Sequence, residues 1–258
     1  MLVACQRSSG FCLLFAVLLF VLLTPGIAHS QASNRTVLDG VYSEPQALRG
    51  QIVYKSACQE CHGASLEGVS GPELTGKRFM DRWREGMLDG IYSFITQRMP
   101  LGRTPNSKTL SDKEYLDILT FILKSNGFPA NATELVPTDL STIKLVGKNG
   151  PQPAPDGALV ITVGCLSRTD DGRWLLIHST EPARSRSELS TAEEVKASAL
   201  QVLSNQVLRL ADLDAAPDFK PEDHNGHKIQ AKGYIVRQTN ADRISVSSLV
   251  MIDSTCLP

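Results

Sequence analysis

Two cysteines and a histidine form the group in this sequence that is best suited to chemistry: Cys58, Cys61 and His62, in the run Cys-Gln-Glu-Cys-His. Two thiols at this spacing can each add to a vinyl group of one haem, and an imidazole directly after the second thiol can bind the haem iron. A Cys-x-x-Cys pair alone is less specific, because thioredoxin-like redox pairs and half zinc sites also use it. The adjacent histidine favours haem attachment over these alternatives.

An iron atom bound by His62 on one side takes a soft, neutral ligand on the other, and a methionine thioether is such a ligand. The candidates are Met80, Met87 and Met99. Met99 precedes Pro100, and a proline forces the residue before it into an extended conformation, which frees the Met99 side chain from helix packing. Met80 and Met87 lie in a stretch with a helical pattern, where core packing is the expected role. The sequence therefore favours Met99 as the second ligand.

A histidine ligand also needs its other ring nitrogen held by a hydrogen-bond acceptor. The run Gly71-Pro72-Glu73-Leu74 follows the cysteines at loop distance. Pro72 has a carbonyl group but no N–H, so its carbonyl is a candidate partner for His62. An ordinary turn of the same composition is the alternative.

The segment before the cysteines is a predicted helix. Ser43 is its N-cap, Gln46 closes a capping box, and the helix is expected to run to about Ala57 and to present Cys58 at its end. Gly50 lies in its middle, where a glycine lets another helix approach closely.

The expected partner for that approach is a helix that begins at Ser111. Ser111 and Glu114 form a capping box, and Asn126-Gly127 ends the helix. Apolar residues at helical spacing occupy one face of it: Tyr115, Ile118, Leu119 and Ile122.

With these features, residues 45–127 resemble a class I c-type cytochrome. The resemblance implies an all-α cytochrome c fold and one haem c, attached through Cys58 and Cys61 and ligated by His62 and Met99. It further implies that the Pro72 carbonyl accepts a hydrogen bond from the His62 ring. In this family pattern the first helix, at Gly50, packs against the last helix near Tyr115.

Trp83 matches the position of an aromatic residue that lies beside the haem propionates in this family, and a buried core tryptophan is the alternative. Four basic residues are close to it in sequence: Lys77, Arg78, Arg82 and Arg84. A solvated helix face is the simplest interpretation of this group. The alternative is that some of these side chains offset the propionates or steer an acidic redox partner.

The first thirty residues have the pattern of a secretory signal peptide. Arg7 is the basic residue, residues 11–23 are apolar, and Ala28-His29-Ser30 offers small residues at a cleavage site. Thirteen apolar residues are too few to cross a bilayer, so we expect cleavage after Ser30 and no transmembrane anchor in the mature chain. Residues 31–44 are then expected to be a flexible leader. The predicted location is the periplasm.

Export has a consequence for the remaining cysteines. Removal of residues 1–30 takes away two of the six cysteines, and haem attachment uses Cys58 and Cys61. Cys165 and Cys256 remain, and in an oxidising compartment they are expected to form a disulfide.

Residues 128–156 contain five prolines and the turn-forming run Gly147-Lys148-Asn149-Gly150, which predicts a Pro-rich linker. For residues 138–146 within it, the alternative is that they pack back on the haem domain. A second domain follows at 157–258, with a short helix expected from Thr191 to about Leu200. Five runs in it have the composition of strands: 158–166, 173–178, 206–211, 227–237 and 243–253.

Five short strands in about 100 residues favour a small Greek-key barrel that resembles an oligonucleotide/oligosaccharide-binding (OB) fold, with an open β-sandwich as the alternative. We expect its first and last strands to be neighbours, which would bring Cys165 toward Cys256. The helix departs from the family pattern, because it lies between strands two and three instead of three and four.

No active site stands out in the second domain. His224 and His227 lie in a predicted turn without cysteine or carboxylate partners at ligand spacing, which favours loop histidines over a metal site. The mature chain has a formal charge of −2 once Arg7 is removed from the total of −1. With few aromatic residues in this domain as well, we expect no nucleic-acid partner.

The sequence as a whole predicts an exported monohaem c-type cytochrome that carries single electrons between redox partner proteins, with an accessory β domain for docking or stability. One alternative is an enzyme, either a haem peroxidase or the electron-accepting subunit of a periplasmic dehydrogenase complex. A peroxidase of the two-haem type would need a second haem motif, and the sequence contains none. The other alternative is a haem-based gas or redox sensor, which would need an open sixth site instead of Met99.

Overall fold

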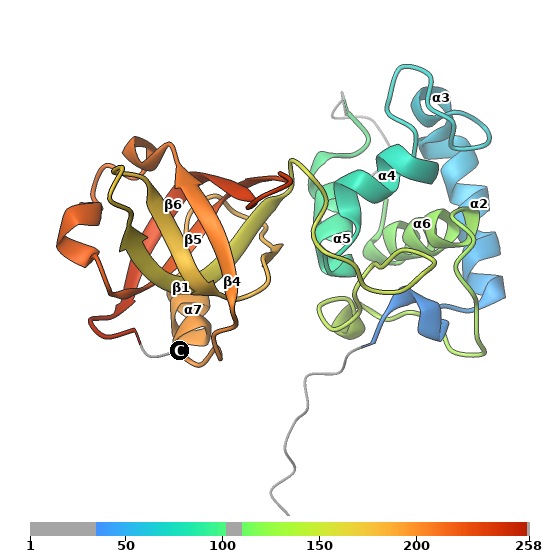
Figure 1. The fold of residues 1–258 in the computed structure, drawn as a ribbon. Helices are drawn as coiled ribbons and strands as arrows, with labels where there is room; N and C mark the ends of the chain where they lie inside the picture. The colour runs from blue at the N-terminus through green and yellow to red at the C-terminus, as the bar shows by residue number, and fades with distance from the viewer. Residues whose placement is uncertain (1–34, 102–109, 257–258) are drawn as a thin grey trace, which may run out of the picture. The chain divides into compact units, whose positions relative to one another are not determined.

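The computed structural model describes residues 35–101 and 110–256. The predicted signal peptide and its cleavage site lie outside the described residues. Helices make up the first part of the described chain and strands the second (Figure 1). Each part has its own hydrophobic core, one formed between Val37 and Val146 and the other between Ala154 and Leu249. Within the described ranges, the helices are all too short or too polar to cross a membrane.

The helical part contains five α-helices and two short 3-10 helices among its described residues. The α-helices are α2 (Glu44–Ala57), α3 (Gln59–His62), α4 (Gly76–Trp83), α5 (Leu88–Arg98) and α6 (Asp112–Ser125). The 3-10 helices are η2 (Val37–Asp39) and η3 (Pro137–Asp139).

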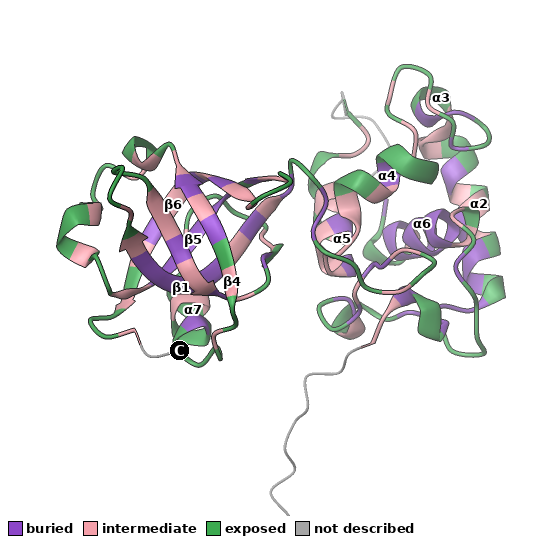
Figure 2. Cartoon of the chain, in the orientation of Figure 1, coloured by how far each residue is buried: buried purple, intermediate pink, exposed green. Residues whose placement is uncertain are grey.

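Helix α6 is the centre of this core. Its capping box between Ser111 and Glu114 is present, as predicted. All nine residues from Tyr115 to Leu123 are buried, which is more than the one apolar face that the sequence pattern predicted (Figure 2). Helices α2 and α5 both pack against α6, so its polar side also lies against protein.

Helix α2 crosses α6 at Gly50, as predicted. A Cβ atom on Gly50 would lie 1.8 Å from the carbonyl oxygen of Asp117 and 3.0 Å from the amide nitrogen of Ile118. Only a hydrogen atom fits at this contact between two backbones. The contact is two residues further along α6 than the Tyr115 position that the family pattern implied.

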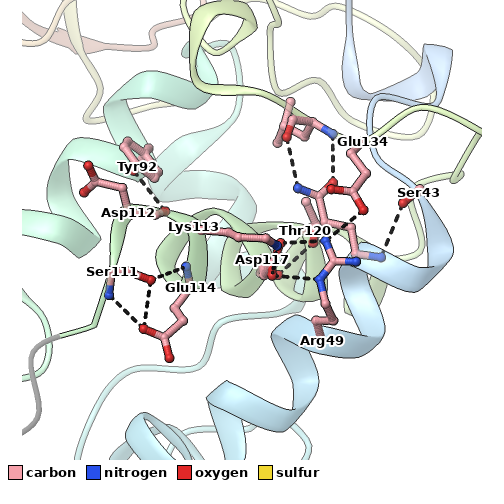
Figure 3. Close-up of polar contacts among 12 residues, drawn as sticks. Ser43, Arg49, Tyr92, Ser111, Asp112, Lys113, Glu114, Asp117, Thr120 and Glu134 are labelled. Atoms are coloured by element: carbon pink, nitrogen blue, oxygen red, sulfur yellow. Dashed lines mark hydrogen bonds and ion pairs between the residues drawn. The ribbon is translucent and has the colours of Figure 1, made fainter.

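A polar network holds the same two helices together (Figure 3). The Asp117 side chain is only 5% exposed. Its carboxylate accepts hydrogen bonds from Arg49 Nε (3.1 Å) and Nη2 (3.3 Å) and from Lys113 Nζ (2.9 Å). Arg49 also binds Glu134 at 2.8 Å. The buried carboxylate is therefore paired on both sides, which such a group requires.

The start of α2 differs in one detail from the prediction. Ser43 is the N-cap and accepts a hydrogen bond from the amide of Gln46. The Gln46 side chain does not close the box. It instead binds both backbone groups of Leu135, at 3.0 Å to the oxygen and 2.8 Å to the nitrogen, because a buried amide side chain needs partners for both of its polar atoms.

Residues 35–43, which we expected to be a flexible leader, are part of the helical core instead. Thr36 forms a capping box with Asp39, and Val37 bonds to the oxygen of Lys144 at 3.0 Å. Tyr42 is 1% exposed and donates its hydroxyl to the oxygen of Phe128 at 2.7 Å. Burial of apolar side chains thus orders a segment whose sequence carries no long helix or strand pattern.

The first two-thirds of the predicted linker are also packed. The buried apolar side chains in this stretch are Phe128, Leu135, Leu140, Ile143, Leu145 and Val146. They belong to the helical core. The boundary between the two domains itself stays a prediction.

The second part is rich in sheet. Its strands are β1 (Leu159–Arg168), β2 (Trp174–Ser179), β3 (Ala183–Arg184), β4 (Gln206–Ala211), β5 (Lys228–Val236) and β6 (Arg243–Asp253). The pairing order is β2-β4-β6-β5-β1-β3, and β2 also pairs with β1. Five strands therefore close into a ring around the second core. All pairs in the ring are antiparallel except β4 with β6, which is parallel.

Helix α7 (Ala192–Ala199) lies between β2 and β4 in the chain, as predicted, and η4 (Leu213–Ala215) and η5 (Pro221–His224) lie between β4 and β5. The completely buried ammonium group of Lys232 on β5 fixes α7 to the ring. It donates to Glu194 on α7 at 2.7 Å and to the backbone oxygens of Leu189 and Ser187. Three acceptors satisfy the three N–H groups of a lysine.

Cys165 and Cys256 form a disulfide, with their Cα atoms 5.5 Å apart. The expectation that the first and last strands are neighbours is wrong, because β5 lies between β1 and β6. In the register, Cys165 on β1 is opposite Lys228 on β5, which is opposite Asp253 on β6. Cys256 lies three residues after Asp253. The chain after β6 therefore extends past the end of β5 and reaches Cys165 on β1.

Candidate functional site

A cavity of about 580 Å³ lies in the helical part, within the range of small-molecule and cofactor sites. The structure brings all six site residues predicted from the sequence to its wall: Cys58, Cys61, His62, Pro72, Trp83 and Met99. The rest of the wall is mainly apolar and includes Leu74, Phe79, Ile91, Phe94, Ile95, Leu110, Ile118 and Ile122. These residues come from all five α-helices and from the loops between them.

The end of α2 positions the cysteines. The Cys58 amide donates to the oxygen of Tyr54 at 2.9 Å and ends α2, and α3 is one turn that brings the His62 amide to the Cys58 oxygen at 3.0 Å. Cys58 is half-buried, Cys61 is exposed, and both thiols are free. Burial raises the pKa of the Cys58 thiol to about 11. Two unpaired thiols and an imidazole therefore share one turn at the cavity wall.

His62 is buried, with 9% of its surface exposed, and its ring is held in one orientation. Its Nδ1 atom lies 2.8 Å from the carbonyl oxygen of Pro72. A carbonyl can only accept, so Nδ1 carries the proton, and Nε2 keeps its lone pair for a metal.

Gly71 has a role in this arrangement that the sequence reasoning missed. A Cβ atom on Gly71 would lie 2.9 Å from His62 Cε1 and 3.1 Å from Nδ1. The absence of a side chain therefore lets the backbone of the Gly71-Pro72 turn reach the imidazole. The signal available in the sequence was a glycine directly before the proline.

Hydrogen bonds fix the loop between α3 and α4. The amides of Val69 and Gly71 both donate to the oxygen of Cys61, at 2.9 Å and 2.8 Å. The Tyr54 hydroxyl donates to the oxygen of Gly63 at 2.7 Å, and burial raises the pKa of this phenol. Tyr54 also lines the cavity, so one side chain supports both α3 and the wall.

Met99 is at the end of α5, where the backbone is extended with φ −120° and ψ 147°, as the following proline requires. The Tyr115 hydroxyl of α6 donates to the Met99 oxygen at 2.7 Å. Among the described methionines of the helical part, Met99 alone lines the cavity. Met80 packs against the helical core, and Met87 is the N-cap of α5.

Helix α4 contributes the basic part of the wall. Arg78 and Arg82 line the cavity. The Arg82 guanidinium carbon is 5.2 Å from the ring centre of Trp83 and 4.9 Å from that of Phe94, distances typical of cation–π contacts. Lys77, by contrast, is 88% exposed and pairs with Asp81.

Similarity to known proteins agrees with this geometry. A family model described as cytochrome C oxidase, cbb3-type, subunit III matches residues 45–122. Cytochrome c-551 of Bacillus subtilis (strain 168) is 32% identical over 81 residues, which are 29% of this chain and 70% of that protein. This chain belongs to the c-type cytochromes. The matching segment is a monohaem class I cytochrome, and membership of the family implies a covalently bound haem c and electron transfer.

Among solved structures, the crystal structure of the sulfane dehydrogenase SoxCD from Paracoccus pantotrophus is similar to this cytochrome at 24% identity. The match covers 44% of this chain and 64% of that chain, with a TM-score of 0.34. A TM-score of this size does not establish a shared fold.

The residues of the cavity fit haem c. The wall supplies two free thiols for attachment, an imidazole with one nitrogen available to iron, and a thioether. An apolar wall suits the macrocycle, and two arginines at the wall suit its acidic groups. In the described residues, no group of three or more histidine, cysteine or acidic side chains forms a further metal site.

Proposed function

We propose that this chain is an exported carrier that passes single electrons between redox partner proteins, with His62 and Met99 as the two iron ligands. The observation that carries this proposal is the convergence of both side chains on one apolar cavity beside Cys58 and Cys61. Cys58 and Cys61 would form the thioether bonds. Bound there, the haem supplies the one-electron chemistry of its iron.

The side chains of the cytochrome determine how readily it accepts an electron. A neutral thioether from Met99 favours ferrous over ferric iron and raises the potential. The Pro72 carbonyl orients the His62 ring and adds to its basicity. The apolar wall would keep water from the haem, and Arg78 and Arg82 would balance the negative charge of its propionates. Trp83, which touches Arg82, would hold that guanidinium in place.

Two other functions are compatible with a haem domain. An electron-accepting subunit of a dehydrogenase complex would use the same ligands and differ only in its permanent partner. A gas or redox sensor would need a vacant or labile sixth position. The presence of Met99 at the cavity wall favours the carrier over the sensor.

Carbon monoxide separates carrier from sensor, because it binds ferrous haem only where a position is open. We expect the reduced wild-type protein to bind carbon monoxide poorly and the Met99→Ala variant to bind it readily. Met80→Ala is the matched control, since Met80 packs in the core, and should behave as the wild type does. Rapid binding by the wild type would contradict the carrier proposal.

For the second part we propose a small Greek-key barrel of the OB type. Support comes from the ring order β1-β2-β4-β6-β5 and from the single parallel pair, β4 with β6. This barrel would serve partner docking or stability. The disulfide in it supports export, because such bonds persist in oxidising compartments.

We place the boundary between the two domains in residues 147–153. Apolar residues up to Val146 are buried in the helical core, and those from Ala154 onward belong to the second core. Lys148 is exposed between them. Limited digestion with trypsin should therefore cleave first after Lys148, and Lys148→Ala should delay it. A first cleavage within 157–258 would argue against this boundary.

A further inference from the structure

His224 and His227 have their ring nitrogens side by side, although the sequence favoured loop histidines over a metal site. The Nδ1 atoms are 3.2 Å apart, the ring centres 5.3 Å apart, and the ring planes are inclined at 68°. The backbone between them is a tight turn, in which the His227 amide donates to the His224 oxygen at 3.0 Å.

The turn that carries the two imidazoles is anchored to β1. Leu166 donates to the His227 oxygen at 3.0 Å and accepts from the Gly226 amide at 2.8 Å. The amide of Arg168 donates to Asn225 Oδ1 at 3.1 Å. These contacts fix the backbone on both sides of the pair.

Packing restricts the rings as well. The Phe219 ring stacks on the His224 ring with centres 4.4 Å apart and planes 25° apart. Both histidines are half-buried. The two nitrogens are therefore held in place before a ligand binds, which lowers the entropy cost of binding that ligand.

The separation of the two nitrogens suits a metal. With zinc–nitrogen bonds of 2.0–2.1 Å, two ligands are about 3.4 Å apart at a tetrahedral angle and about 2.9 Å apart at a right angle. The observed 3.2 Å lies between these values. Imidazole is also a preferred ligand of zinc, copper and nickel ions.

We propose that Nδ1 of His224 and Nδ1 of His227 together bind one divalent transition cation such as Zn²⁺. Each ring would be neutral, with its proton on Nε2. No third histidine, cysteine or acidic side chain joins them in a group within the described residues, so water completes the coordination and binding is reversible.

The charges around the pair permit a cation. The Lys228 ammonium points to the oxygens of Ala199 and Gln201, both at 3.1 Å. The Asp253 carboxylate lies close enough to His227 and Lys228 to interact with both. Hydrogen bonds from Thr255 are the main cause of the lowered pKa of Asp253, and the charge of Lys228 adds to it.

The alternative is a direct N–H···N hydrogen bond between the rings, for which 3.2 Å is at the long end of the usual range. Calorimetric titration of Zn²⁺ into the untagged, haem-loaded protein distinguishes the two. We expect one Zn²⁺ per chain, and an affinity that falls at least about tenfold in His224→Ala and in His227→Ala. His178→Asn, in the same domain, is the matched control and should keep the wild-type affinity.

A second measurement needs no variant and so does not depend on whether the variants fold. With ¹⁵N-labelled histidines, Zn²⁺ should shift the ring Nδ1 signals of His224 and His227 together and leave that of His178 in place. Absence of zinc binding, affinities of both alanine variants within twofold of the wild type, or a zinc-induced shift at other histidines would each overturn the proposal.

Discussion

The helical part and the sheet part of this cytochrome are each stabilised by a different kind of internal contact. In the helical part, two backbones touch at Gly50, and separate segments converge on one cavity. In the sheet part, strands close a ring by ladder pairing, and one disulfide joins residues 91 positions apart. The first arrangement depends on a few positions where nothing larger fits. The second spreads its stability over many pairs and adds a covalent bond.

The largest loss of stability is expected from a substitution of Gly50, where only a hydrogen atom fits between two helices. In Gly50→Ala the new Cβ atom would be 1.8 Å from a backbone oxygen, and no rotamer change relieves that contact. The cost should exceed the roughly 1–3 kcal/mol typical of overpacking. We expect little folded haem-loaded protein, measured by haem absorbance per chain.

Gly90 on α5 provides the matched control. A Cβ atom there would meet no atom within 4 Å. Gly90→Ala should therefore raise stability by about 0.5–1 kcal/mol, because alanine lowers the entropy of the unfolded chain. Equal stability of the two variants would show that the close contact at Gly50 does not limit the helical part.

The next effect concerns the covalent bond of the sheet part. Replacement of both Cys165 and Cys256 by serine should lower the free energy of unfolding of the barrel by roughly 3–5 kcal/mol, because the unfolded chain loses a long closed loop. The haem absorbance should not change. Loss of the haem spectrum in this variant would show that the two parts are not independent.

A smaller effect is expected from the polar network between α2 and α6. Asp117→Asn removes a buried negative charge that accepts from Arg49 and Lys113, and should cost about 2 kcal/mol in a chemical denaturation experiment. Lys77→Gln removes the exposed pair with Asp81 and should cost no more than about 0.5 kcal/mol. A cost for Lys77→Gln as large as that for Asp117→Asn would contradict this assignment.

The smallest effect is a difference in pH dependence between the regions. For Glu194 in the sheet part, burial alone would raise the pKa, but hydrogen bonds from Lys232 and Thr191 outweigh it and lower the pKa below 4.5. The resulting stability is present above pH 4.5 and is lost as the pH falls through the folded-state pKa. Glu194→Gln should therefore reduce the acid sensitivity of the barrel.

The pKa of Glu85 in the helical part is shifted in the opposite direction to that of Glu194. Burial raises its pKa above 4.5 despite the hydrogen bond from the Gln152 amide. The stability that Glu85 contributes is present below pH 4.5 and is lost as the pH rises through its raised folded-state pKa. Thermal unfolding of Glu85→Gln and Glu194→Gln between about pH 3 and 6 should show slopes changed in opposite directions. Changes of the same sign would contradict both assignments.

Short-range patterns made much of this molecule predictable. The capping box of α6, the extended backbone at Met99 and the short helix near Thr191 each follow from residues within a few positions. The disulfide followed from counting cysteines. The strand runs were recognisable because alternation along a strand is itself local.

Features that depend on distant contacts were not predictable in this way. Residues 35–43 and 128–146 are ordered by burial of their apolar side chains in the helical core, and neither segment has a periodic pattern of its own. The position of β5 between β1 and β6 depends on which edges pair. The side-chain partner of Gln46 is Leu135, 89 residues away, so no local motif could have named it.

The central proposal is that Met99 would bind the haem iron together with His62, and absorption spectroscopy of the oxidised protein tests it most directly. A sulfur–iron bond gives ferric haem a weak far-red band. We expect this band in the wild type, in Met80→Ala and in Met87→Ala, and its loss in Met99→Ala. A wild-type spectrum without the band, or a band that survives in Met99→Ala, would contradict the proposal.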